Sequence, residues 1–117
     1  MKTVLFLVRS APYGSAAIPE GARACLGFAT MPLDLTFLLT EDAAWACAPD
    51  QVPESIQAPA VPALLETLLD ADVKVAVDAE ALSARGLDPQ GLPEGVVAVS
   101  AAAIGDLVHH SDAILTY

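Results

Sequence analysis

Four acidic side chains follow apolar segments of the sequence, where the strands of a parallel sheet would place them at one edge. Asp78 comes directly after the apolar run Val73–Val77, Glu80 lies two residues further on, and Glu41 and Asp42 follow another apolar run. Reacting groups in open α/β sheets lie beyond the carboxyl ends of strands, and paired carboxylates can act as general acid and base. No histidine, metal motif or second nucleophile accompanies these acids. We therefore interpret them as rim charges that favour the starts of helices.

The two cysteines and two histidines predict no disulfide, metal site or cofactor. Cys25 falls on the apolar face of an expected helix, where a thiol behaves as a small hydrophobe. Cys47 follows Trp45 in a short segment without a basic neighbour to lower its pKa, so a nucleophilic role has little support. His109 and His110 are adjacent and would point in different directions on a helix. At a helix end they would instead interact favourably with the helix dipole.

The loop Ser10–Ser15, SAPYGS, joins an apolar run to the expected start of a helix. Backbone N–H groups at such a junction can hold an anion, but this loop matches neither the G-x-G-x-x-G motif nor the phosphate-binding P-loop. We expect a turn at Gly14, Ser15 as the cap of the helix, and Tyr13 exposed to a partner.

Apolar runs alternate with helix-like segments along the sequence. The expected strands are Lys2–Val8, Leu33–Thr40, Val73–Val77, Val96–Val99 and Asp112–Tyr117. The expected helices run from Ser15 to before Pro32, from Ala60 to Asp72, from Glu80 to a glycine stop at Gly86, and from a cap at Ser100 to about His109, with a short acidic helical turn from Glu41. Apolar strands separated by helices predict a three-layer α/β/α sandwich, flavodoxin-like in appearance, around a mostly parallel five-stranded sheet with right-handed crossovers.

Composition limits the classes of function. A chain of 117 residues predicts a single domain over residues 1–117, and 55% hydrophobic residues suffice for a core. With 15 acidic and 5 basic residues the net charge is −10, which disfavours direct nucleic-acid binding. The acidic excess fits either a solvated surface, which is the more common case, or a basic partner. No apolar run reaches the ~20 residues of a membrane span. The N-terminal apolar run breaks at Arg9, too early for a signal peptide, so we expect a cytoplasmic protein.

Several stretches together resemble the DsrE/DsrF/DsrH sulfur-relay family. They are SAPYGSAAIPEG, LTFLLTEDAAWACAPDQVPE, LSARGLDP and the closing SDAILTY, in this order. The likeness covers essentially the whole chain and is greatest to the DsrF/TusC type of subunit. It implies a compact α/β/α fold and oligomers, typically a hexamer of paired heterotrimers. It also implies transfer of persulfide sulfur between cysteines, for 2-thiolation of transfer RNA or for sulfur oxidation.

The resemblance bears directly on Asp78. In the active DsrE/TusD-type subunits, the persulfide cysteine lies eight residues before the glycine of an Arg-Gly pair. Counted back from Gly86, that position here is Asp78, and a carboxylate cannot form a persulfide. The resemblance therefore implies a non-catalytic, architectural subunit that binds related DsrE- and DsrH-type subunits in a homo- or hetero-oligomer, trimer or hexamer.

Tyr13 and Trp45 are candidate aromatic anchors for such an interface, although Trp45 fits the core equally well. Two alternatives stay open. One is a stand-alone sulfurtransferase that uses Cys47. The other is a module that binds a small anion or ligand at the Tyr13–Ser15 loop.

Overall fold

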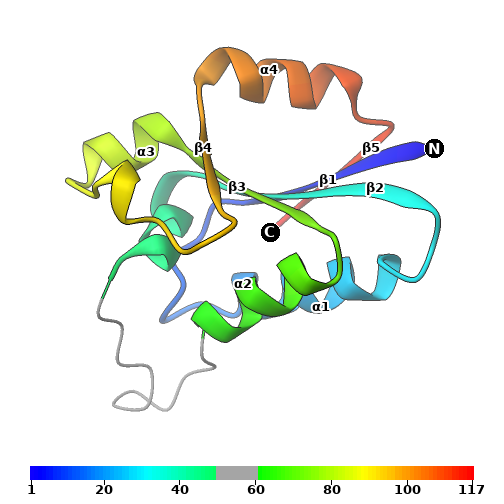
Figure 1. Cartoon of the computed structure of the whole chain (residues 1–117), viewed down its shortest axis with the longest axis horizontal. Coiled ribbons are helices and arrows are strands. Elements are labelled where there is room, and N and C mark those ends of the chain that lie inside the picture. Colours follow the sequence, from blue (N-terminus) through cyan, green and yellow to red (C-terminus); the bar gives the residue numbers. More distant parts are fainter. Residues whose placement is uncertain (50–60) are drawn as a thin grey trace.

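The computed structural model of the chain describes residues 1–49 and 61–117. Within these ranges, five strands alternate with helices as expected (Figure 1). The strands are β1 (Lys2–Val8), β2 (Leu33–Leu39), β3 (Lys74–Asp78), β4 (Val97–Val99) and β5 (Ala113–Thr116). The α-helices are α1 (Ala17–Phe28), α2 (Val61–Asp70), α3 (Ala79–Ala84) and α4 (Ala101–His110), and the 3₁₀ helices are η1 (Glu41–Cys47) and η3 (Pro89–Gly91). Gln51–Pro53, part of the second family-like stretch, lies outside the described residues.

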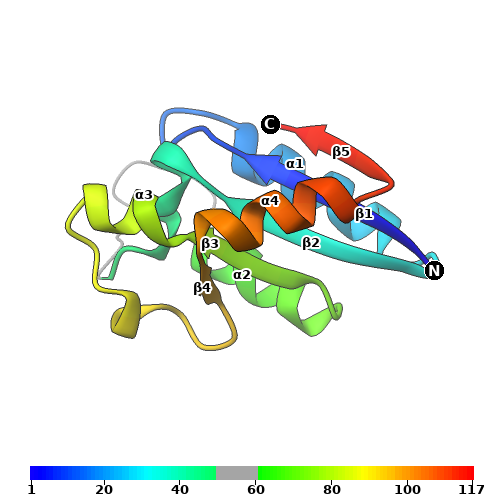
Figure 2. The same cartoon turned by 90° about the horizontal axis from the view of Figure 1, so that it is seen from above.

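The sheet has the strand order β4-β3-β2-β1-β5, and every neighbouring pair is parallel. The expected sandwich is confirmed, and the sheet is parallel throughout where a mostly parallel one was predicted. The connections from β1 to β4 all step in one direction across the sheet, whereas the connection from β4 to β5 steps back past β1. Because crossovers are right-handed, α1 and α2 cover one face of the sheet and α4 covers the other (Figures 1 and 2).

The two faces of the sheet are buried to different extents. Alternate strand residues, among them Phe6 and Phe37, pack with α1 and α2 into the large core cluster. On the opposite face, among the described residues, only Leu5, Leu38 and Ala76 form a buried cluster, and no residue of α4 is fully buried. We call these the α1/α2 face and the α4 face.

Helix α1 begins later than expected. The cap predicted at Ser15 is wrong by one position, because the N-cap residue is Ala16 and no side chain caps the helix. Ser15 Oγ accepts a hydrogen bond from the N–H of Ala17 at 3.1 Å, so the serine still binds the first turn from outside the cap position. Cys25 is fully buried on the inner side of α1, as predicted.

Local signals define the ends of α3 and α4. Gly86 follows α3 with a φ of +68°, its N–H donates to Ser83, and the next N–H, of Leu87, donates to Leu82. This is a Schellman motif, and it confirms the predicted glycine stop. At the start of α4, Ser100 Oγ accepts from the N–H of the third helical residue, which confirms the predicted cap.

Candidate functional site

Asp78 lies at the carboxyl end of β3, where both of its oxygens accept hydrogen bonds. Thr40 Oγ1 donates to Oδ2 at 2.9 Å, and the backbone N–H of Glu80 donates to Oδ1 at 3.0 Å. The first bond joins the ends of β2 and β3, and the second makes Asp78 the N-cap of α3, a position that aspartate favours. Asp78 is therefore held as an acceptor that organises the strand end.

Two of the other acids at this edge, Glu41 and Asp42, are paired with arginines. Arg9 Nε lies 2.9 Å from Glu41 Oε2, and Arg85 Nη2 lies 2.8 Å from Asp42 Oδ1. The structure thus places Glu41 and Asp42 just past β2, close in sequence to Thr40, the partner of Asp78. The carboxylates of Glu41, Asp42 and Asp78 are each bound to a different group, so among the described residues this edge holds separate polar contacts and no hydrogen-bonded pair of acids for proton transfer.

Both cysteines are buried and protonated. Cys25 is fully buried, and desolvation raises the pKa of its thiol to about 12. Cys47 is 3% exposed, and desolvation raises the pKa of its thiol to about 11. With that pKa only ~10⁻⁴ of Cys47 is thiolate at neutral pH, and the thiolate is the nucleophile. Cys47 borders a hollow of about 220 Å³ that Gly86 and Leu87 also line. Its thiol is nevertheless buried and protonated, as is typical of a cysteine in a hydrophobic core.

The loop before α1 offers few free donors for an anion. Gly14 has a φ of +83°, which supports the predicted turn. Ser15 Oγ already accepts a hydrogen bond from the N–H of Ala17, which is one of the donors that a bound anion would need. Tyr13 is half-buried and packs against the core cluster, so it is less exposed than expected. These contacts favour a structural role for the loop.

Trp45 lies on the surface of η1. It is 41% exposed, whereas its neighbours Ala44 and Ala46 are fully buried. Of its two expected positions, core or surface, the structure shows the surface. Large aromatic side chains in that position are common anchors of protein interfaces.

The α4 face exposes apolar side chains on both sides of its single helix. Val97 on β4, Val108 on α4 and Ile114 on β5 are each at least 40% exposed. The register aligns Val97 with Ala76 and Ile114 with Leu5, so both strand residues point to the α4 face. We call Val97, Val108 and Ile114 the α4-face patch. One ten-residue helix is too narrow to cover a five-stranded sheet.

Sequence reasoning missed the partners of the edge carboxylates. Thr40 had a usable signal, because the register that aligns Leu39 with Val77 also brings Thr40 beside Asp78. No local pattern links Arg85 to Asp42, 43 residues away, because their contact depends on how η1 packs against α3.

Comparison with known proteins now decides the family. A model of the DsrE/DsrF-like family matches residues 2–117. The chain belongs to this family. It is 34% identical over 91 residues to Protein TusC of Escherichia coli K12, which is 77% of this chain and 76% of that protein. Protein TusC of Shigella sonnei matches to the same extent. The predicted resemblance, including the likeness to the TusC type of subunit, is confirmed.

Solved structures confirm the fold. The ychN protein of Escherichia coli superposes with a TM-score of 0.89 at 24% identity, over all of both chains. The MTH1491 protein of Methanobacterium thermoautotrophicum superposes with a TM-score of 0.68 at 16% identity, over 93% of this chain and 90% of that one. Among the described residues, no helix has the length and apolar character that crossing a bilayer requires.

Proposed function

We propose that this chain is a non-catalytic, architectural subunit of a sulfur-relay complex that serves transfer-RNA 2-thiolation or sulfur oxidation. The observation that carries the proposal is the bonding of Asp78. In persulfide transfer, an acceptor thiolate attacks the outer sulfur of a persulfide, the S–S bond breaks, and the donor leaves as a thiolate. Asp78 has no sulfur atom that could form a persulfide. Both of its oxygens accept hydrogen bonds, one from Thr40 and one from the backbone N–H of Glu80 in the first turn of α3.

The state of the two thiols supports the same role. Cys25 on α1 and Cys47 at the end of η1 both lie in the large core cluster, and burial raises the pKa of both thiols above the ordinary value of 9.0. A carrier thiol must be reachable and must be ionised to at least a few per cent at neutral pH. Neither thiol meets these conditions, so sulfur would pass between cysteines of the related subunits.

The α4-face patch and Trp45 are the proposed contacts with those DsrE- and DsrH-type subunits. The patch is apolar, and Trp45 supplies an aromatic anchor. Stable interfaces bury roughly 1,200–2,000 Å² in total. The exposed edge strands β4 and β5 with α4 between them provide a broad surface for one (Figure 2).

The test is co-purification of this chain with DsrE- and DsrH-type chains of the same organism, with the particle mass measured by light scattering. We expect one complex that contains this chain, and we expect Val97→Lys to release it. Met31→Lys is the matched control, because Met31 is 52% exposed against 56% for Val97 but lies in the turn between α1 and β2. A chain that stays monomeric beside both related subunits, or equal behaviour of the two variants, would contradict the proposal.

A further inference from the structure

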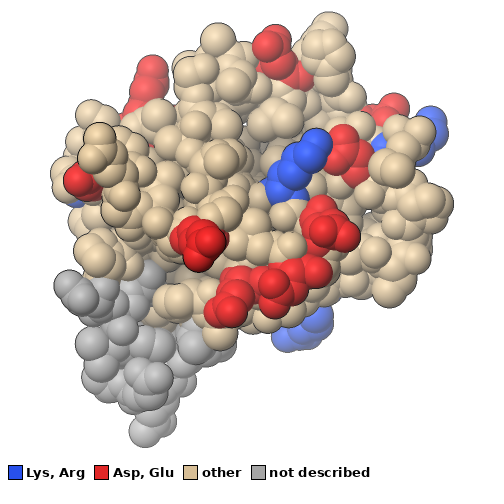
Figure 3. Space-filling view, viewed as in Figure 1, with Lys and Arg blue, Asp and Glu red and all other residues tan. Residues whose placement is uncertain are grey.

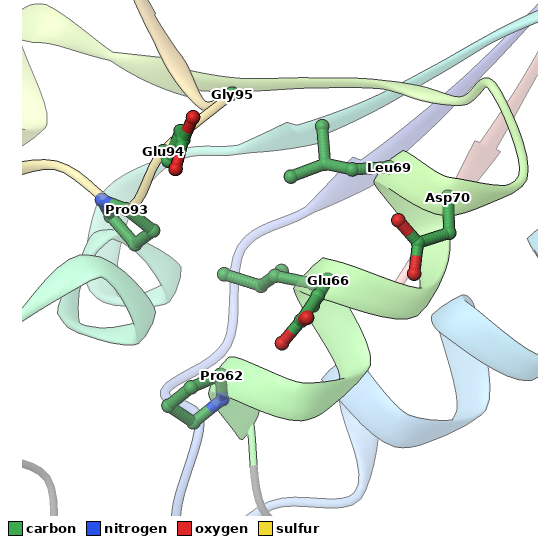
Figure 4. Close-up of a pocket in the computed structure, with 8 residues that line it drawn as sticks. Pro62, Glu66, Leu69, Asp70, Pro93, Glu94 and Gly95 are labelled. Atoms are coloured by element: carbon green, nitrogen blue, oxygen red, sulfur yellow. The ribbon is translucent and has the colours of Figure 1, made fainter.

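A hollow of about 480 Å³ lies between α2 and the segment that precedes β4. Figure 4 shows its two banks, with Glu66, Leu69 and Asp70 on α2 and with Glu94 on the segment opposite. Leu65 is buried, and Leu69 is half-buried beside Gly95, so the floor is apolar. The three carboxylate side chains at its rim belong to exposed residues. We call this hollow the α2 groove.

The carboxylates of the α2 groove form no ion pair with a cation of the described residues. Glu66, Asp70 and Glu94 take part in none of the three ion pairs within the described ranges 1–49 and 61–117. Those pairs already engage three of the five basic residues of the chain, and residues 50–60 contain no basic residue at all. Figure 3 shows acidic side chains gathered over α2 on this side of the molecule.

The placement of two of these acids also destabilises their own helix. Glu66 and Asp70 are four residues apart on α2, the spacing at which like charges repel. Asp70 is the last residue of α2, and a negative charge at that end opposes the helix dipole. Glu66 and Asp70 thus repel each other, Asp70 opposes the helix dipole, and neither forms an ion pair with another described residue that would offset this cost. Such locally unfavourable charges are expected where the side chains serve a function other than folding.

We infer that the α2 groove is a docking site for a basic segment of a protein partner. A lysine or arginine side chain fits its chemistry, because the aliphatic stem can cover Leu69 and Pro93 while the charged head reaches Glu66 and Glu94. The negative rim selects for such a segment and speeds its association. The inference goes beyond the proposed function and does not depend on it, because α2 and the α4-face patch lie on opposite faces of the sheet.

The test uses the isolated chain and amide NMR titration with an amphipathic helical peptide of leucine and lysine. The same peptide with glutamate in place of lysine is the negative probe. We expect the largest shifts at residues 62–70 and 93–95. The triple variant Glu66→Gln, Asp70→Asn and Glu94→Gln should bind at least about tenfold more weakly. The control triple Glu20→Gln, Glu80→Gln and Asp106→Asn removes the same charge from other exposed positions and should bind within about twofold of the wild type.

Thermal unfolding separates a lost site from a damaged fold. The groove triple should melt at or above the temperature of the wild type, because it removes the repulsion within α2 and at its C-terminus. Equal weakening by the two triples would mean that only the overall charge attracts the peptide, and shifts centred outside the groove would mean that it binds elsewhere. Either result would overturn the docking site.

Discussion

The two faces of the sheet differ sharply although the same five strands make both. On the α1/α2 face, alternate strand residues such as Phe6 and Phe37 are fully buried. On the α4 face, Val97 and Ile114 stay exposed on the two edge strands, and α4 buries none of its residues fully. The difference arises from strand order and crossover handedness, which put two long helices on one face and one on the other. It indicates that one face stabilises the chain while the other is available to a partner.

The largest expected effect of a single change is on the α1/α2 face. Phe37→Ala should lower the free energy of unfolding by about 3–5 kcal/mol, because it removes a fully buried ring and leaves a cavity. Denaturant unfolding of the isolated chain measures it. Val97→Ala, on the other face, should change stability by less than about 0.5 kcal/mol. Similar losses in the two variants would mean that the faces contribute equally to the fold.

Alkaline titration probes the thiols of the same face. The folded pKa values, about 12 for Cys25 and about 11 for Cys47, lie above the ordinary value of 9.0. The folded state therefore keeps protons that the unfolded state loses. Their contribution to stability is complete below pH 9 and is lost as the pH rises through the folded pKa values. The slope approaches ~1.4 kcal/mol per pH unit for each thiol.

Unfolding free energies measured between pH 8 and pH 11 test that slope. The variant Cys25→Ala with Cys47→Ala should show a shallower decline than the wild type. The two slopes would be equal if the thiols were open to solvent.

A smaller loss is expected at the strand ends. Asp78→Ala removes the cap of α3 and the bond from Thr40, and should cost about 1–2 kcal/mol. Asp78→Asn is the control, because asparagine Oδ1 also caps helices while its Nδ2 can donate to Thr40 Oγ1, so most of the stability should remain. If both variants unfold at the same denaturant concentration as the wild type, the two hydrogen bonds do not organise this edge.

The smallest effect on stability, paired with a clear effect on assembly, is expected in the α4-face patch. Val108→Lys should change the free energy of unfolding by about 0.5 kcal/mol or less, since the side chain is already 42% exposed. The same change should weaken binding to related subunits at least about tenfold, because a buried lysine lacks a partner in an apolar interface. Isothermal titration against the purified partners measures that loss, and unchanged affinity would remove Val108 from the interface.

Much of the fold could be predicted because its signals are local. Apolar runs indicated buried parallel strands, and Gly86 and Ser100 marked helix ends through their own backbone and side-chain chemistry. The unequal faces could not be predicted, because Phe37 and Val97 both lie in apolar runs and only strand order separates their environments. The arginine partners of Glu41 and Asp42 could not be predicted either, because only tertiary packing brings these residues together.

Persulfide loading of the isolated chain tests the central claim most directly. A cysteine desulfurase with ³⁵S-labelled cysteine supplies the sulfur, and label bound to the chain is measured beside the Cys25→Ala, Cys47→Ala control. We expect the wild type to retain no more label than this control, because its thiols are buried and protonated. Asp78→Cys, with a half-buried thiol at the carboxyl end of β3, should gain label. Label held by the wild type and lost in Cys47→Ser would contradict the account.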